Sequence, residues 1–377
     1  MTTGDAIDES HAQRIERIEL RRIRMELRAP IVTAYGVEHE RDALIVRVTT
    51  EGADGWGECA ALTEPTYASE YVDGAMHVIV HHLAPRLGAG ALRATDVRAR
   101  LGSVVGHHMA KAALELAVLD AELRSCGQSL ATRLGATRRR VAVGVTIGIN
   151  DDVEAMLDDL APWVAAGYRH VKLKIKPGVD VAPARALRAA HPRVSLALDA
   201  NGSYDAARAI ATLDHLGVDL IEQPLPADDL LGHRALLREM VTPIGLDESV
   251  TSPGIATLAA QLGLCAAMAL KPGRLGGILT TAALARNLHA AGVATWIGGM
   301  YETGIGRAAN VALAALDVVT MPPDWSESDR YWSDDLTPTL IATDGELAVP
   351  DGPGIGVSPI SQRLDEVTVE RVELRPS

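Results

Sequence analysis

Short apolar runs recur along the second half of the chain, and this recurrence constrains the fold more than any other feature. Eight runs lie between residues 141 and 321 at intervals near 25 residues, with amphipathic helical segments between them. They read VAVGVTIGI (141–149), HVKLKI (170–175), SLALDAN (195–201), LIEQPL (220–225), IGLDES (244–249), AMALKPG (267–273), TWIGG (295–299) and DVVTM (317–321). Eight strand–helix units predict parallel strands closed into an α/β barrel.

The competing architecture for such a repeat is a doubly wound open sheet. That fold typically carries a glycine-rich dinucleotide loop after its first strand, and none follows residues 141–149. Outside the repeat, residues 15–60 predict antiparallel strands and residues 68–134 predict helices. Residues 339–342 and 367–370 predict further strands in the tail, which we expect to pack on the N-terminal region.

Charge and cysteine usage exclude several classes of function. The formal net charge of −13 argues against nucleic-acid binding, which needs a basic surface. Three widely spaced cysteines without a CxxC pair predict neither a disulfide framework nor a zinc cluster. The polar N-terminus does not resemble a signal peptide, and no apolar run approaches the roughly 18 residues of a membrane span. We therefore expect a cytoplasmic protein without nucleic-acid or membrane partners.

Ionisable residues stand at the ends of five apolar runs, where a strand buried on both faces is expected to be apolar. They are Lys174, Asp199, Glu222, Asp247 and Lys271, separated by 25, 23, 25 and 24 residues. A single such residue is explained as well by a helix cap or a surface group. Five in register predict one charged side chain per strand at the carboxyl-terminal rim, where barrel enzymes carry their active sites.

The three carboxylates of this set would repel one another strongly in a barrel mouth without a cation. A donor set made only of oxygen, with no histidine, favours Mg²⁺ or Mn²⁺ over zinc. We therefore expect Asp199, Glu222 and Asp247 to bind a divalent cation.

The segment KLKIK (172–176) places two lysines on one face of a strand, because side chains alternate along it. Lys172 and Lys174 are expected to face the barrel interior and, together with the cation, to lower each other's pKa, so that one can act as a base. Lys271 would lie across the barrel from Lys174. A substrate carboxylate between them would have a lysine on each face of its α-carbon, which indicates proton abstraction there. A Schiff-base aldolase and a non-catalytic binding barrel are the alternatives.

These residues resemble a known family. KLK (172–174), DAN (199–201), IEQP (221–224), DES (247–249) and KPGR (271–274) together resemble the muconate-lactonising subgroup of the enolase superfamily. GWGECAALTEPTYASEY (55–71), GGMYETGIGRAAN (298–310) and DGPGIGV (351–357) are similar to its o-succinylbenzoate synthase / N-succinylamino-acid racemase family. The resemblance implies a modified (β/α)7β barrel at residues 136–338. It also implies an α+β capping domain built from residues 15–135 and 339–377, behind a disordered tail at 1–14.

The resemblance also implies roles for individual residues. The three carboxylates would bind Mg²⁺, and the two strand-end lysines would be the acid/base pair. Lys172 would support Lys174 and the substrate carboxylate, and Asn201 would lie near the metal. Loops at residues 33–35 and 60–67 would close over the substrate. The other implied pocket residues are Thr146, Gly299, Met300, Tyr301 and Tyr35.

Two reactions are implied, and they share the first proton abstraction. One is racemisation of N-succinyl or other N-acyl amino acids; the other is the dehydration that forms o-succinylbenzoate in menaquinone biosynthesis. Arg274 favours racemisation if its charge tunes Lys271, whereas pairing with a surface carboxylate is the alternative. Residues 317–324 lack the DxD motif of dipeptide epimerases, which favours an N-acylated substrate. Departures at Tyr35 and Ala309 leave the substrate preference open. The expected partners are a small carboxylate and further copies of the chain, as a dimer or an octamer.

Overall fold

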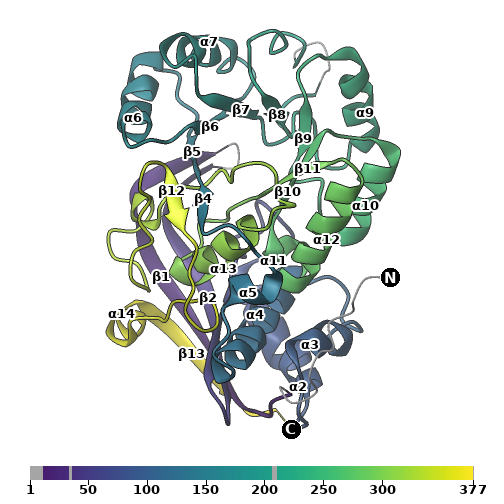
Figure 1. Cartoon of the computed structure of the whole chain (residues 1–377), viewed down its shortest axis with the longest axis vertical. Helices are drawn as coiled ribbons and strands as arrows, with labels where there is room; N and C mark the ends of the chain where they lie inside the picture. Colours follow the sequence, from purple (N-terminus) through teal and green to yellow (C-terminus); the bar gives the residue numbers. More distant parts are fainter. Residues whose placement is uncertain (1–11, 34–35, 206–209, 377) are drawn as a thin grey trace.

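The computed structural model describes residues 12–33, 36–205 and 210–376, and it has two parts. Strands β5 to β11 and the helices around them form one part, and a four-stranded sheet with its helices forms the other (Figure 1). The predicted α/β barrel with an α+β cap is confirmed. No helix among these residues is long and apolar enough to cross a membrane.

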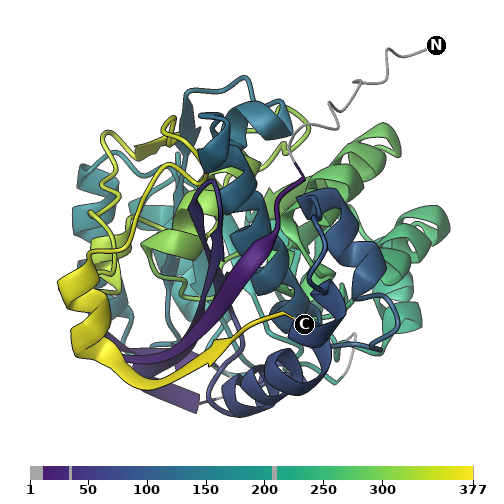
Figure 2. The ribbon, with the colours of Figure 1, turned by 90° about the horizontal axis from the view of Figure 1, so that it is seen from below.

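The capping sheet has the strand order β13-β1-β2-β3, with antiparallel neighbours. Its strands are β1 (Ile15–Thr33), β2 (Gly36–Thr50), β3 (Asp54–Cys59) and β13 (Thr368–Leu374). Strand β13 follows helix α14 (Ser361–Val367) and pairs with β1, so the first and last strands of the structure lie side by side in one sheet (Figure 2).

Helix α4 (His108–Ser125) packs against this sheet at very short range. A Cβ on Gly55 would stand 2.0 Å from the carbonyl oxygen of Ala117, and one on Gly57 would stand 2.1 Å from that of Ala113. Only glycine in the strand and alanine in the helix allow this approach. The remaining capping helices are α1 (Val72–Val78), a π-helical turn at Ile79–Leu83, α2 (Ala84–Leu87), α3 (Ala94–Arg100) and α5 (Leu130–Leu134).

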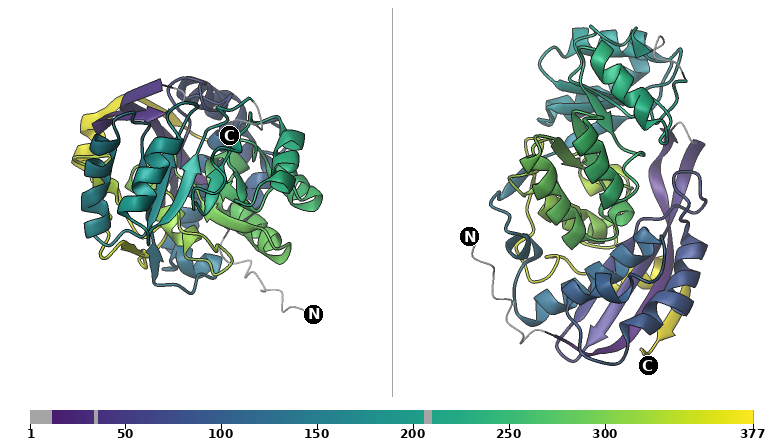
Figure 3. Two further views of the ribbon diagram at one scale, coloured as in Figure 1. Left: turned by 90° about the horizontal axis from the view of Figure 1, so that it is seen from above. Right: turned by 90° about the vertical axis from the view of Figure 1, so that its right-hand side faces the viewer.

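The barrel sheet contains seven parallel strands in the order β11-β10-β9-β8-β7-β6-β5. Helices follow most of the strands and cover the outside of the curved sheet (Figure 3). The strands are β5 (Gly144–Ile147), β6 (His170–Lys174), β7 (Ser195–Asp199), β8 (Leu220–Glu222), β9 (Ile244–Leu246), β10 (Ala267–Leu270) and β11 (Ala294–Ile297). The helices are α6 (Val153–Ala165), α7 (Val181–Ala190), α9 (Leu230–Glu239), α10 (Pro253–Leu262), α11 (Pro272–Leu275), α12 (Ile278–Ala290) and α13 (Gly304–Ala314).

The strand predicted at residues 317–321 is wrong. This segment forms no strand, and the chain instead crosses the remaining gap with isolated backbone hydrogen bonds to its neighbours. The amide of Met321 donates to Thr295 O at 3.0 Å, and the amide of Gly144 donates to Pro323 O at 2.8 Å. Pro322 and Pro323 lack the N–H groups that a continuous ladder requires, which explains the irregular closure.

Two further strand predictions need correction. Residues 141–149 divide into β4 (Arg140–Ala142), which pairs with β12 (Glu346–Ala348) outside the barrel, and β5 inside it. Residues 339–342 form no strand, because their backbone amides bond to side chains. Leu340 N donates to Ser328 Oγ at 3.3 Å, and Ala342 N donates to Glu327 Oε2 at 2.7 Å.

Candidate active site

The five ionisable residues of the strand ends meet at one rim of the barrel. Lys174, Asp199 and Glu222 are the last residues of β6, β7 and β8, and the parallel register pairs Lys174 with Asp199 and Asp199 with Glu222. Asp247 and Lys271 directly follow β9 and β10. All five side chains are buried although they are ionisable, and none is more than 8% exposed. The strand register therefore gathers the charges that the sequence spacing predicted.

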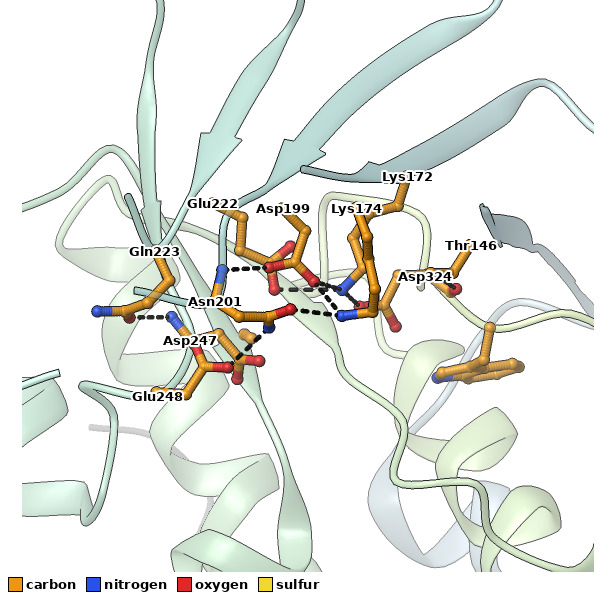
Figure 4. A network of polar contacts seen from close by, with 12 residues as sticks. Thr146, Lys172, Lys174, Asp199, Asn201, Glu222, Gln223, Asp247, Glu248 and Asp324 are labelled. Carbon is orange, nitrogen blue, oxygen red and sulfur yellow. Dashed lines mark hydrogen bonds and ion pairs between the residues drawn. The ribbon is translucent and has the colours of Figure 1, made fainter. Parts of the chain in front are cut away.

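Lys172 and Lys174 both point from β6 toward the carboxylates of neighbouring strands (Figure 4). Nζ of Lys172 lies 3.1 Å from Asp199 Oδ2 and 3.2 Å from Glu222 Oε1, and it also contacts the carboxylate of Asp324. Nζ of Lys174 lies 2.9 Å from Asp199 Oδ2. Two ammonium groups from one strand thus hold the acidic residues of three other segments.

The opposite side of the cluster is built around Lys271. Its Nζ lies 2.8 Å from Asp247 Oδ2 and 2.8 Å from the hydroxyl of Tyr67. Arg274 Nη2 lies 2.8 Å from Asp247 Oδ1, and its Nη1 donates to the same Tyr67 hydroxyl. Burial raises the pKa of Tyr67, so its hydroxyl meets both cations as a neutral phenol. The alternative that Arg274 pairs with a surface carboxylate is wrong, because Arg274 is 6% exposed and faces Asp247.

Two left-handed residues turn the chain immediately after the strand ends. Asn201 has φ 43° and Gln223 has φ 39°, a conformation that non-glycine residues adopt rarely and that is often retained at functional sites. The Gln223 amide oxygen accepts hydrogen bonds from the backbone of Asp247 at 3.0 Å and of Ser249 at 3.1 Å. These turns fix the direction in which the acidic side chains leave the sheet.

The lowered lysine pKa was expected in the presence of a cation, and in the protein chain alone the pKa of both β6 lysines is raised instead. Burial lowers the pKa of Lys174, but the adjacent Asp199 carboxylate outweighs it, and the pKa is raised. The pKa of Lys172 is raised as well, because Asp199, Asp324 and Glu222 outweigh its burial. The spacing of residues in the sequence indicates the neighbouring ammonium group but not how closely the carboxylates approach.

The charge balance of the cluster tests whether a divalent cation fits. The cluster contains five buried carboxylates and four buried cationic side chains. They are Asp199, Glu222, Asp247, Glu248 and Asp324, and Lys172, Lys174, Lys271 and Arg274. Burial raises the pKa of Glu222, and the nearby carboxylates of Asp199 and Asp247 raise it further. Burial and Asp247 likewise raise the pKa of Glu248. A divalent cation would bring the net charge of the cluster close to zero once a substrate carboxylate binds. Because the available donors are carboxylate oxygens, their chemistry fits Mg²⁺ or Mn²⁺.

The carboxylate oxygens of the cluster are not arranged around a common metal position. Within the described part of the chain, no group of three acidic, histidine or cysteine side chains is spaced as metal ligands would be. The carboxylates of Asp199, Glu222 and Asp247 are instead in ion pairs with lysine ammonium groups. The residues expected to bind the cation are thus brought to one rim, while their oxygens are directed at lysines.

Above this rim lies a small cavity of about 80 Å³. A larger neighbouring cavity of about 600 Å³ shares part of its wall. Thr146, Lys174, Tyr301 and Tyr331 line both. Tyr301 has φ 58°, so a bulky residue is held in a strained backbone conformation between the two cavities.

The structure brings most of the predicted pocket residues to the small cavity. Thr146, Lys172, Asn201, Gly299, Met300 and Tyr301 line it. Arg274 does not, and it lines a separate cavity of about 430 Å³ behind Tyr67. Tyr35 lies outside the described residues.

Sequence reasoning missed several residues of this cavity. Asp324 lies at the end of the proline-interrupted eighth run, and its rim position could have been inferred by extending the strand-end argument by one unit. No strand-end pattern in the sequence pointed to the other three cavity residues, which are Trp325, Tyr331 and Arg307. They lie in irregular segments and in helix α13. Arg307 is fully buried, with its guanidinium 4.7 Å from the ring of Trp325.

Comparisons with known proteins identify the family and support the fold. The family described as "Mandelate racemase / muconate lactonizing enzyme, N-terminal domain" matches residues 17–135, and "Enolase C-terminal domain-like" matches residues 155–363. A solved structure of an enolase-superfamily member from Listeria innocua superposes with a TM-score of 0.93 at 34% identity, covering 96% of this chain and 99% of that one.

Curated relatives match along nearly their whole length. An N-succinylamino acid racemase from an Amycolatopsis species is 46% identical, covering 95% of this chain and 99% of the relative. An o-succinylbenzoate synthase from Geobacillus kaustophilus is 39% identical, covering 94% and 96%. The chain therefore belongs to the mandelate racemase / muconate lactonizing enzyme group of the enolase superfamily.

Proposed function

We propose that this enzyme removes the proton α to a carboxylate with two lysines, and that it racemises N-succinyl or other N-acyl amino acids. The observation that carries the proposal is the placement of Lys174 at the end of β6 and of Lys271 directly after β10, both lining one cavity. The carboxylates of β7, β8 and β9 lie between them along the rim. This arrangement supports a substrate carboxylate held at the acidic residues, with its α-carbon between two amines.

Each lysine would serve one face of the substrate. With a divalent cation bound at Asp199 to offset the charge that raises the pKa of Lys174, this lysine would take the α-proton of one enantiomer as a neutral amine. The ammonium group of Lys271 would deliver a proton to the other face. The reverse reaction exchanges the two roles. Lys172, held by Asp199, Glu222 and Asp324, would supply a fixed positive charge for the substrate carboxylate.

We propose Asp199, Glu222 and Asp247 as the ligands of Mg²⁺ or Mn²⁺. When bound, this cation stabilises the negative charge that develops on the substrate carboxylate as the proton leaves. The substrate would enter the acidic cluster only with the cation present, because without it another carboxylate would add to an excess of negative charge.

Dehydration to o-succinylbenzoate is the second candidate, and the names of several relatives favour it. It would need Lys174 as the base and Lys271 only as a fixed cation. The same first step therefore serves both reactions, and the shape of the cavity around Thr146 and Tyr301 would decide between substrates.

The test measures both reactions with one preparation in the presence of Mg²⁺. Optical rotation follows N-succinyl-L-amino acids, and ultraviolet absorbance follows dehydration of 2-succinyl-6-hydroxy-2,4-cyclohexadiene-1-carboxylate. We expect loss of rotation that stops on chelation and returns with Mg²⁺. Dehydration without any loss of rotation would make the enzyme a dedicated synthase. Activity with neither substrate would contradict the proposal.

A further inference from the structure

The two proposed catalytic lysines are anchored in the same chemical way. Nζ of Lys174 donates to a carboxylate oxygen of Asp199 at 2.9 Å and to the side-chain amide oxygen of Asn201 at 2.8 Å. This lysine is therefore held by one charged and one neutral oxygen. Both come from β7 and the turn that follows it, so these two anchors of Lys174 belong to the barrel.

Lys271 has the same pair of oxygen types from different sources. Asp247 supplies the carboxylate at 2.8 Å, and Tyr67 supplies the neutral oxygen, also at 2.8 Å. Tyr67 lies between β3 and α1, so it belongs to the capping part of the chain. Its ring centroid is 4.8 Å from Nζ of Lys271, which adds a cation–π contact.

Two anchors fix the direction of an amine. An ammonium group has three tetrahedral N–H donors, so two fixed acceptors leave a single direction for the third. In the neutral amine the same two acceptors hold both N–H groups, and the lone pair takes the free direction. For each lysine, the neutral oxygen therefore helps to decide whether the third position points at the substrate.

We propose that Tyr67 is the positioning residue for Lys271, the counterpart of Asn201 for Lys174. This inference rests on the proposed two-base function. Removing the Tyr67 hydroxyl would leave Lys271 free to rotate about its contact with Asp247, while the anchors of Lys174 stay in place. The loss would then fall on one face of the substrate only. The capping part of the chain would orient Lys271, whereas the orientation of Lys174 would not depend on the capping part.

The test compares Tyr67→Phe with the parent enzyme in D₂O. Proton NMR follows the initial loss of the α-proton separately from the D- and L-forms of one N-acyl amino acid, with Mg²⁺ present. The Lys271→Ala variant identifies the enantiomer whose exchange depends on Lys271. We expect Tyr67→Phe to slow exchange of that enantiomer about tenfold, as for loss of one charge-assisted hydrogen bond. The other enantiomer should change less than about twofold, within ordinary context effects.

Tyr71→Phe is the matched control, because Tyr71 lies on the same segment and is 38% exposed, whereas Tyr67 lines the cavity together with Lys271. It should leave both rates at the parent values, and thermal unfolding should verify that both variants fold. Equal losses on the two faces, or no loss on either, would overturn the role of Tyr67. Absence of exchange in the parent enzyme itself would refute the proposed function, and this inference with it.

Discussion

Gly298 offers a way to displace a proposed catalytic lysine without disturbing the fold. A Cβ at this position would stand 2.6 Å from Cε and 3.1 Å from Cγ of Lys271, and ordinary contact begins near 3.4 Å. The Gly298→Ala substitution must therefore push the end of this side chain by about 0.8 Å, the difference between these distances. The backbone at Gly298 does not have positive φ, so alanine fits its conformation.

The displacement should affect catalysis far more than stability. The flexible lysine can yield, and replacing glycine by alanine also restricts the unfolded chain, so the free energy of unfolding should change by less than about 1 kcal/mol. A misplacement near 1 Å can cost about 100-fold in rate, and we expect a fall of that order in kcat. Both 2.8 Å contacts of Lys271 Nζ, to Asp247 and Tyr67, would lengthen or break.

Gly273→Ala provides the control for this substitution. Gly273 lies two residues after Lys271, and a Cβ there would meet only Ala60 and Met109 at 3.4 and 3.5 Å. Polarimetric racemisation and thermal unfolding of both variants would be compared with the parent. Full activity in Gly298→Ala, or an equal loss in Gly273→Ala, would refute the argument that the position of Lys271 limits the reaction.

Three further substitutions test other parts of the account. Arg274→Gln should lower racemisation at least about tenfold, because it removes a buried charge that contacts Asp247; unchanged racemisation would remove Arg274 from the mechanism. Asp324→Asn should lower kcat/KM about tenfold by releasing one anchor of Lys172, and steady-state kinetics that match the parent would speak against that role. Burial raises the pKa of Glu115 to about 7. Between about pH 4.5 and pH 7 the folded state therefore holds a proton that the unfolded state releases, and the free energy of unfolding decreases as pH rises. Glu115→Gln should flatten this decline by up to about 3 kcal/mol, and identical melting curves across pH 5 to 8 would contradict it.

The barrel was predictable because its signals are local and repeated. A charge at the end of a short apolar run is visible in the sequence, and parallel register turns equal spacing into equal height at the rim. Lys174, Asp199 and Glu222 meet for this reason. The prediction of an eighth strand at residues 317–321 rested on the period alone and is wrong. Pro322 and Pro323, which follow this segment, cannot donate hydrogen bonds to a strand ladder.

Contacts between distant segments could not be read in the same way. The sequence placed Tyr67 in a capping loop, but nothing in its neighbourhood indicated that its hydroxyl would meet Lys271, 204 residues away. The direction of the lysine pKa shift in the protein chain alone could not be inferred for a similar reason. Its sign depends on distances to carboxylates on other strands, and spacing along the chain does not provide those distances.

The central claim is that Lys174 and Lys271 act on opposite faces of one α-carbon. The most direct measurement follows α-proton exchange in D₂O from each enantiomer of an N-acyl amino acid, with Lys174→Ala and Lys271→Ala. We expect that neither variant racemises and that each still exchanges one enantiomer, with the two variants retaining opposite enantiomers. Loss of exchange from the same enantiomer in both variants, or racemisation by either, would contradict the two-base arrangement.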